Sequence, residues 1–211
     1  MSLLPIDNKL FSLVISWLEK EENYKWLDFG FGSQPIPPAA FLMMLKKPQH
    51  CLRVFTAEVD ATPIGVVAFS NIHPQFRTAM LWYLLGNKSY EAKGETTRAV
   101  GQLLKLGFRE LGLSAVHAWV AEGNAASVRI LERNSFRLIG RQRHCLYIDG
   151  KPRDRLLFDL LASEFPGIKE NRIPGVASGA ASLVGGVLSE VAHAGVPADL
   201  TTVFQVVIEV L

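Results

Sequence analysis

A loop of small and charged residues that runs directly into an amphipathic helix, at positions 90–111, constrains the fold of this chain more than any other stretch. One face of the predicted helix is apolar, which is typical of a helix packed on a sheet. The apolar residues at helical spacing are Val100, Leu103, Leu104, Phe108 and Leu111. Thr96 or Thr97 is expected to cap the amino end of the helix through its hydroxyl.

The start of this helix has the chemistry of an anion site. Its first backbone N–H groups lack intrahelical partners, and the helix dipole places positive charge there. Lys93 and Arg98 add charged side chains, and Gly94 allows a ligand to approach the backbone closely. A pyrophosphate is the anion that this arrangement suits best. An ordinary capped core helix would show the same pattern, so both interpretations stay open at this point.

A second motif follows a strand-like run at positions 115–120. Asn124, Ser127, Glu132 and Phe136 form the pattern N-x-x-S-x-x-x-x-E-x-x-x-F. Together with the loop and helix at positions 90–111, this order of elements resembles the GNAT acetyltransferases, specifically the RimJ/RimL group of ribosomal-protein alanine N-acetyltransferases. The resemblance extends over about residues 7–165.

Four positions depart from the pattern of that group. Ala92 and Ser135 stand where the group has glycine, and Thr96 stands where it has Gly or Ala. Glu91 replaces an Arg, Gln or Trp and brings a negative charge near the expected phosphates. That charge is unfavourable for an anion unless the side chain points away from the site.

The resemblance implies an α/β fold with a mixed, mostly antiparallel sheet, a splayed pair of parallel strands and helices on both faces. It also implies acetyl-coenzyme A as the acyl donor, with the pantetheine arm held by the strand at positions 78–85 and the phosphates by the helix start. The cofactor-binding residues that it implies are Tyr83, Leu84, Leu85, Ala92, Lys93, Gly94, Glu95, Thr96, Thr97, Asn124 and Ser127.

Catalysis in that family is a direct transfer, in which an amine attacks the thioester and a thiolate departs. We expect Ser127 to act as the general acid or hydrogen-bond donor to the sulfur. The backbone N–H of Leu84 or Leu85 is the expected donor to the thioester oxygen. Glu122 is the candidate base. The alternatives left open for the base are His73, His117 and bulk water.

Local signals predict the remaining elements. Asp7 is expected to cap a helix that runs to Leu18, with a short helix at 21–27 and another at 38–47. Strands are expected at 52–59, 64–72, 78–85, 138–148 and 155–161, and Asp149-Gly150 predicts a tight hairpin between the last two. The first helical region, which overhangs the acceptor side in the family, offers a mixture of polar and aromatic residues for an acceptor: Asn23, Tyr24, Trp26, Asp28 and Phe29.

Composition limits the partners. With a formal net charge of +2 and no basic run, the chain is not expected to bind nucleic acid or an anionic membrane. Cys51 and Cys145 lie in strand-like stretches without other ligands at metal spacing, so we expect free core thiols and no metal site. No secretory signal is evident at the amino end, and a cytoplasmic location is expected.

Composition also divides the chain. Residues 1–165 are expected to form the acetyltransferase domain, and residues 166–211 a linker followed by an apolar helical tail. The tail is expected to fold back on the domain or to pair with another chain, in a homodimer or with a protein partner.

The predicted function is acetyl-coenzyme A dependent N-acetylation of a primary amine, on a small molecule or a protein N-terminus. Two alternatives stay open. One is a noncatalytic module that binds coenzyme A or acyl groups and docks a partner through the tail, and the other is an acyltransferase linked to carrier-protein or surface-sugar biosynthesis.

Overall fold

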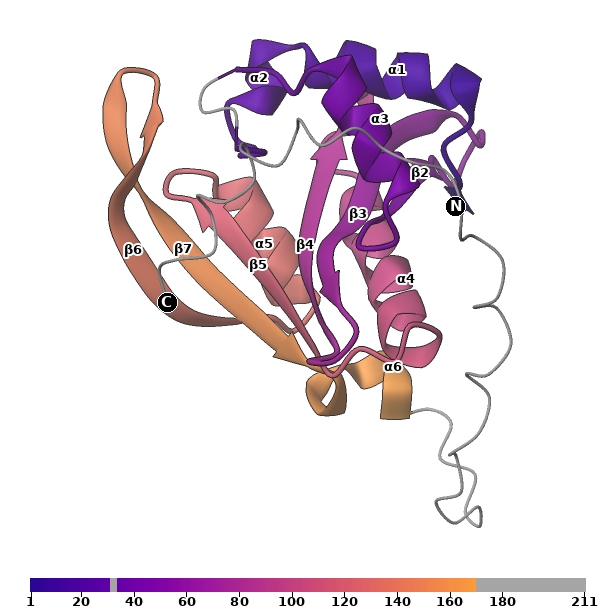
Figure 1. The fold of residues 1–211 in the computed structure, drawn as a ribbon, viewed down its shortest axis with the longest axis vertical. Helices are drawn as coiled ribbons and strands as arrows, with labels where there is room; N and C mark the ends of the chain where they lie inside the picture. Colours follow the sequence, from indigo (N-terminus) through magenta and orange to yellow (C-terminus); the bar gives the residue numbers. More distant parts are fainter. Residues whose placement is uncertain (31–33, 170–211) are drawn as a thin grey trace, which may run out of the picture. The chain divides into compact units, whose positions relative to one another are not determined.

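The computed structural model describes residues 1–30 and 34–169. Within them, one sheet has the strand order β1-β2-β3-β4-β5-β7-β6 (Figure 1). Its strands are β1 (Leu3–Leu4), β2 (Cys51–Thr56), β3 (Pro63–His73), β4 (Thr78–Leu85), β5 (Ala115–Ala121), β6 (Arg137–Ile148) and β7 (Lys151–Leu161). The helices are α1 (Asn8–Leu18), α2 (Glu21–Tyr24), α3 (Pro38–Lys46), α4 (Glu95–Arg109), α5 (Ala125–Arg133) and α6 (Pro166–Lys169), with single 3-10 turns η1 (Lys88–Tyr90) and η2 (Ala162–Glu164).

Neighbouring strands of this sheet are antiparallel except for β4 and β5, which run parallel. The parallel pairing ends early, because its last partners are Met80 and His117. Beyond this point β4 continues beside β3 to Leu85, and β5 continues beside β7 to Ala121. The two parallel strands therefore part, which confirms the predicted splayed pair.

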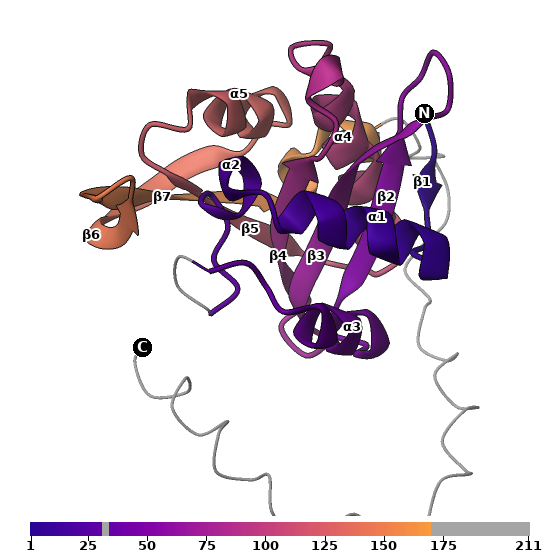
Figure 2. The same cartoon turned by 90° about the horizontal axis from the view of Figure 1, so that it is seen from above.

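Helices cover both faces of the sheet, as predicted (Figure 2). On one face α4 and α5 enclose a core around Phe69, Leu103 and Leu104. On the other, α1 and α3 enclose a second core around Trp17 and Phe41. Side chains of a strand alternate between the two faces, so successive residues of β4 belong to different cores. Tyr83 packs against the first core and Leu84 is buried in the second.

Two local signals are confirmed by the geometry of the backbone. The Asp7 carboxylate accepts a hydrogen bond from the Leu10 N–H over 2.8 Å and caps α1. Asp149 and Gly150 have φ of 52° and 71°, the left-handed pair that a two-residue type I′ hairpin requires.

Three local expectations are wrong. Gly94, at φ 75°, is the N-cap of α4 in place of Thr96 or Thr97, and no side chain caps this helix. Leu111 lies beyond the end of α4 and is exposed, because the helix stops at Arg109. Cys145 is exposed in an irregular part of β6, so it is not a core thiol.

Residues directly after 165 belong to the folded unit. The stretch predicted as a linker begins with α6, and the Arg109 guanidinium donates a hydrogen bond to the Gly167 carbonyl. By internal contacts the chain divides into Met1–Arg172 and Ile173–Leu211. The rest of the predicted tail, residues 170–211, lies outside the described residues. No helix in the described part of the chain is long and apolar enough to cross a membrane.

Candidate active site

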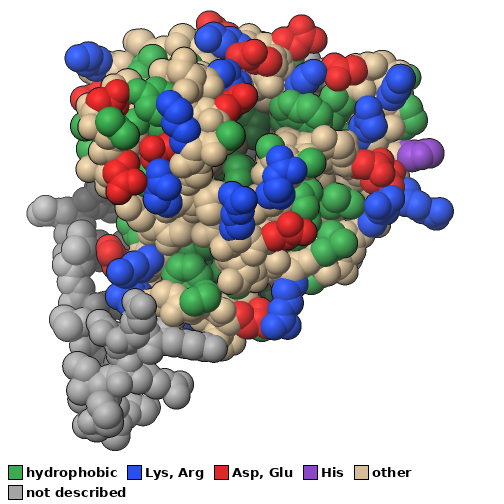
Figure 3. Space-filling model, turned by 180° about the vertical axis from the view of Figure 1, so that it is seen from behind, with side chains coloured by type: hydrophobic (Ala, Val, Ile, Leu, Met, Phe, Trp, Pro, Cys, Tyr) green, Lys and Arg blue, Asp and Glu red, His purple; other side chains and the backbone are tan. Residues whose placement is uncertain are grey.

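A cleft of about 590 Å³ lies where β4 and β5 part. Its walls come from α2 and the residues after it, from β4 and β5, from the first turn of α4 and from α5. On the face that carries α4 and α5, the surface is hollowed, with hydrophobic side chains in the hollow and both basic and acidic side chains around it (Figure 3). The residues for which the sequence predicts a coenzyme A contact, the catalytic candidate Ser127 among them, all line this cleft except Lys93, whereas the expected base Glu122 does not.

The helix start on this face has an open backbone. Gly94 precedes α4 in a left-handed conformation, and the main chain turns into the helix as Arg98 N–H bonds to the Gly94 carbonyl over 3.1 Å. Ala92 also has a positive φ, 58°, which is the conformation that a glycine adopts most easily. The first N–H groups of α4 and its dipole together suit an anion such as a pyrophosphate.

The side-chain charges at the helix start differ from the expectation. The Arg98 guanidinium lies 3.1 Å from the Glu95 carboxylate and 3.4 Å from that of Glu58, so its charge is largely neutralised. The Lys93 ammonium lies over the ring of Tyr90, 4.6 Å from its centroid. Glu91 is exposed and its carboxylate lies 3.8 Å from Lys88. The charge of Glu91 is therefore partly balanced.

Two basic side chains of the cleft were not anticipated from the sequence. Arg129 and Arg133 lie one turn apart on α5 and line the cleft. Neither makes an ion pair or a hydrogen bond through its guanidinium with any described residue. Their i, i+4 spacing within the motif at positions 124–136 is the signal that could have found them.

The register of β4 identifies which backbone groups face the gap. In an antiparallel ladder, alternate residues direct their N–H and C=O groups to the partner strand. The Gly86 N–H donates to the Ile64 carbonyl on the β3 side over 2.8 Å. By alternation Leu84 also faces β3, whereas the N–H groups of Tyr83 and Leu85 face the side where β5 has departed. Of the two donors expected for the thioester oxygen, Leu85 has the correct orientation.

Ser127 is held by two contacts at the start of α5. The Asn124 side chain caps the helix, because its Oδ1 accepts from the Ser127 N–H over 3.1 Å. The Tyr83 hydroxyl donates to the Ser127 carbonyl, also over 3.1 Å. Burial raises the pKa of Tyr83, so this hydroxyl stays protonated and acts as a donor. The Ser127 hydroxyl itself makes no hydrogen bond within the described residues, which leaves it free for a ligand.

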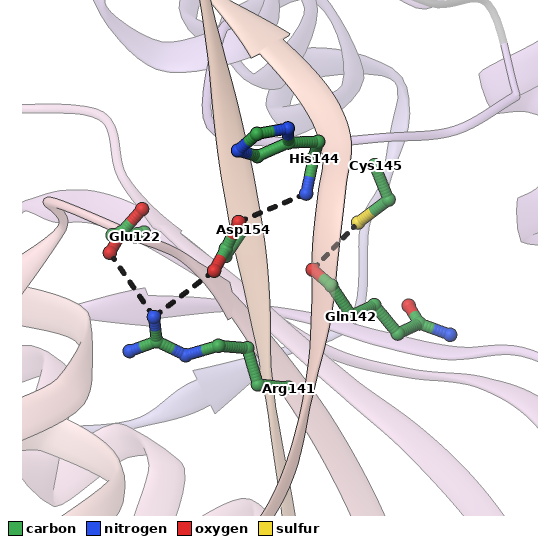
Figure 4. A network of polar contacts seen from close by, with 6 residues as sticks. All are labelled: Glu122, Arg141, Gln142, His144, Cys145 and Asp154. Carbon is green, nitrogen blue, oxygen red and sulfur yellow. Dashed lines mark hydrogen bonds and ion pairs between the residues drawn. The ribbon is translucent and has the colours of Figure 1, made fainter.

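The expected base, Glu122, does not line the cleft and instead faces Arg141 in a polar network of the β6–β7 hairpin (Figure 4). Its carboxylate is 3.6 Å from Arg141 Nη1, which in turn lies 3.0 Å from Asp154 Oδ2. Asp154 Oδ1 accepts from the His144 N–H over 2.9 Å. That backbone hydrogen bond and the Arg141 charge lower the pKa of Asp154. This network fixes the irregular part of the β6–β7 hairpin and does not bring Glu122 to the cleft.

The two histidine alternatives are also placed elsewhere. His73 stacks on Phe76 with ring centroids 4.2 Å apart, and its Nδ1 accepts the Phe76 N–H over 3.3 Å. His117 lies on β5 opposite Met80, where the two parallel strands are still paired. Neither histidine lines the cleft.

The opposite end of the cleft is walled by the residues expected to meet an acceptor, with the exception of Tyr24. Phe29 meets Trp82 of β4 edge to face, with ring centroids 5.1 Å apart. Asn23 is buried, and its amide donates to the Trp17 carbonyl over 2.8 Å. The Asp28 carboxylate lies 3.0 Å from the Arg155 guanidinium. These contacts fix α2 and the segment after it against the sheet beside the gap.

Comparison with known proteins agrees with this geometry. Residues 5–137, more than half of the chain, match the family model described as the acetyltransferase (GNAT) domain. The chain is 33% identical over 110 residues to the putative ribosomal N-acetyltransferase YdaF of Bacillus subtilis (strain 168), covering 52% of this chain and 60% of that protein. It is 31% identical over 116 residues to the probable N-acetyltransferase YjcK of the same organism, covering 55% of this chain and 64% of that protein. The matched region thus spans less than two thirds of the length of these relatives.

Solved structures show the same fold. A spermidine N-acetyltransferase from Vibrio cholerae, in complex with CoA and spermine, superposes with a TM-score of 0.68 at 17% identity over 77% of this chain and 96% of that one. A GNAT-family acetyltransferase from Bacillus anthracis gives a TM-score of 0.62 at 18% identity, over 77% and 95% of the two chains. With the parted strands, the open helix start and the matching sequence, the chain belongs to the GNAT acetyltransferase family.

Proposed function

We propose that this protein transfers an acetyl group from acetyl-coenzyme A to a primary amine, on a small molecule or on the N-terminus of a protein. The observation that carries this proposal is that one and the same cleft runs through the parted strands and is lined from both faces of the sheet. It has the helix start and Ser127 on one face of the sheet, and Asn23 and Phe29 on the other. Relatives named as N-acetyltransferases support the same chemistry.

The chain supplies position and hydrogen bonds for this reaction. The N–H groups at the start of α4 bind the phosphates of the donor, and the free backbone groups of Tyr83 and Leu85 pair with the amides of its arm. The Leu85 N–H donates to the thioester oxygen as negative charge develops there. The Ser127 hydroxyl donates to the departing sulfur.

The proton of the amine leaves to water in this proposal. Among the described residues, the carboxylates that line the cleft are those of Glu22, Asp28, Glu91 and Glu95. Asp28, Glu91 and Glu95 already face Arg155, Lys88 and Arg98, respectively. The fourth, Glu22, is exposed on α2, and Glu122 does not line the cleft. We therefore assign the proton to water and expect an acceptor that is partly neutral at the working pH.

One observation favours the alternative of a noncatalytic module that binds coenzyme A. Neither the carboxylate nor the imidazoles considered as the base reach the cleft, and binding alone needs no base. Release of free thiol from acetyl-coenzyme A, measured with a panel of amines, separates the two functions. The panel contains spermidine, an amino sugar and peptides with N-terminal Ala or Ser. We expect thiol release that depends on one class of amine, and binding of coenzyme A without any release would support the module instead.

A further inference from the structure

Arg129 and Arg133 add positive charge to the side of the cleft where the acyl donor is proposed to bind. This charge is separate from the positive end of the α4 dipole. Both line the cleft from α5, and the described residues offer neither of them a partner. The other basic side chain in the cleft wall, Lys88, faces Glu91. An unneutralised pair of guanidinium groups on one helical face is a site for a further anionic group.

The position of the pair is fixed by the contact between α5 and α4. The Asn134 amide, next to Arg133, donates to the Thr97 carbonyl in the first turn of α4 over 3.2 Å. Gly101 allows this approach, because a Cβ there would lie 3.1 Å from Asn134 Oδ1. The end of α5 that carries Arg133 therefore lies against the helix start, whereas Ser127 at the other end lies beside the gap.

We propose that Arg129 and Arg133 bind the ribose 3′-phosphate of coenzyme A and make the protein select coenzyme A over its 3′-dephospho form. This rests on the proposed function, because it assumes that the pyrophosphate occupies the start of α4. The backbone N–H groups there serve one anionic group, and coenzyme A carries a second, separate phosphate on the ribose. A guanidinium fork matches a phosphate monoester in charge and in donor geometry.

The charges around the helix start favour this division of roles. Arg98 is held by Glu95 and Glu58, so it does not supply charge to a second phosphate. Glu95 is buried in the cleft wall and faces Arg98, so the charges of these two side chains offset each other. Among the basic side chains that line the cleft, the arginines of α5 are the ones without a counter-charge in the described chain, and Lys93, which does not line it, lies over the Tyr90 ring.

Calorimetric titration of the full chain with coenzyme A and with 3′-dephospho-coenzyme A tests the proposal. The wild-type protein is expected to bind coenzyme A at least about tenfold more tightly, since charge-assisted hydrogen bonds are the strong ones. The double variant Arg129→Ala, Arg133→Ala is expected to bind both ligands equally, with its affinity for the dephospho form close to wild type. Added salt should reduce the selectivity of the wild type and have little effect on that of the double variant.

Arg143→Ala is the matched control, because Arg143 is an exposed arginine of β6 outside the cleft. It removes one charge and should keep the selectivity. Equal binding of both ligands by the wild type would overturn the inference and leave the proposed function standing. If the double variant loses affinity for both ligands equally, the inference is also overturned, and the arginines would then be assigned to binding the pyrophosphate. If the wild type binds neither ligand, the proposed function falls together with the inference.

Discussion

The hydroxyl of Tyr83 on β4 donates a hydrogen bond of 3.1 Å to the main-chain carbonyl of Ser127 in the first turn of α5. These residues lie on either side of the gap in the sheet, 44 positions apart in sequence. The bond sets how far α5 stands from β4, and with it where the Ser127 hydroxyl is presented. On the proposed function, Tyr83 is therefore a positioning residue for Ser127, in addition to the role proposed for its backbone in binding the donor.

Replacing Tyr83 with Phe should lower kcat and leave the affinity for coenzyme A within about twofold of the wild type, because the backbone of β4 is unchanged. The loss of one hydrogen bond should lower the free energy of unfolding by about 1 kcal/mol. Steady-state kinetics, calorimetry and urea unfolding measure the three quantities. Tyr24→Phe is the control, since the Tyr24 hydroxyl makes no hydrogen bond with any described residue and this residue does not line the cleft. An unchanged kcat in Tyr83→Phe would show that the bond has no bearing on turnover.

Replacing Ser127 with Ala should lower kcat by on the order of tenfold or more, because the departing sulfur loses its hydrogen-bond donor. The affinity for coenzyme A should change little, since the Asn124 cap uses the backbone N–H of residue 127 and survives the substitution. Ser16→Ala, on the exposed side of α1, serves as the control. Normal turnover in Ser127→Ala would show that this hydroxyl has a structural role and takes no part in catalysis.

A Trp at position 94 should abolish binding of coenzyme A by filling the space in front of the helix start. Gly112 provides a matched control, because it also has a positive φ, 65°, and nothing lies within 4 Å of a Cβ there. Both Gly94→Trp and Gly112→Trp should lose about 1–2 kcal/mol of stability to backbone strain. Only the first should lose binding in calorimetry. A folded Gly94→Trp protein with wild-type affinity would disprove the phosphate site.

Asp154→Asn should destabilise the protein in a way that depends on pH. The pKa of Asp154 is lowered in the folded state by the His144 N–H and by Arg141. The carboxylate therefore contributes stability that is complete above its ordinary pKa of about 3.9 and is lost as the pH falls through the lower folded value. The difference in Tm between wild type and variant should be largest near neutral pH and should disappear in strong acid.

Asp159→Asn is the control for that experiment, because it removes the same charge from the same strand, β7, and the Asp159 carboxylate makes no ion pair or hydrogen bond with any described residue. Its Tm difference from the wild type should vary little over the same acidic range. A pH-independent difference for Asp154→Asn would mean that the ionised carboxylate does not hold the bulge of the hairpin.

A chain shortened after Arg172 should keep its fold and its binding of coenzyme A, because the cleft residues all precede this point. A chain shortened after Phe165 should melt at a lower temperature, because it lacks α6 and the hydrogen bond from Arg109 to the Gly167 carbonyl. Thermal melts and calorimetry of the two shortened chains test this boundary. Loss of binding in the longer one would show that the second unit takes part in the site.

Features that depend on neighbouring residues could be read from the sequence. The Asp7 cap joins residues 3 positions apart, and the Asp149-Gly150 turn needs two adjacent residues. The Asn124 cap on the Ser127 N–H also joins residues 3 positions apart, although the sequence pattern predicted only a cofactor contact for Asn124. The family pattern placed the loop at positions 92–97 on the cleft even though its glycines are partly replaced. Ala92 shows why this works, since it adopts the positive φ of the residue that it replaces.

Features that depend on residues distant in the chain could not be predicted from the sequence. Arg98 looked like a ligand for phosphate because its neighbour Glu58 comes from the turn between two strands, 40 positions earlier in the chain. Glu122 looked available as a base because Arg141 reaches it from another strand. In both cases the side chain has the charge that the predicted role needs. Tertiary packing, however, brings a side chain of opposite charge next to it, and this contact replaces the predicted one.

The parting of β4 and β5 also bears on the kinetic mechanism, that is, on whether both substrates are bound at the same time. In the proposed reaction, the acyl donor and the amine reach the gap from opposite faces of the sheet, so neither needs to leave before the other arrives. On the proposed function, no side chain has to carry the acetyl group in between. Initial rates measured at several fixed concentrations of one substrate should therefore give double-reciprocal lines that intersect, the signature of a ternary complex, and parallel lines would require a covalent acetyl-enzyme.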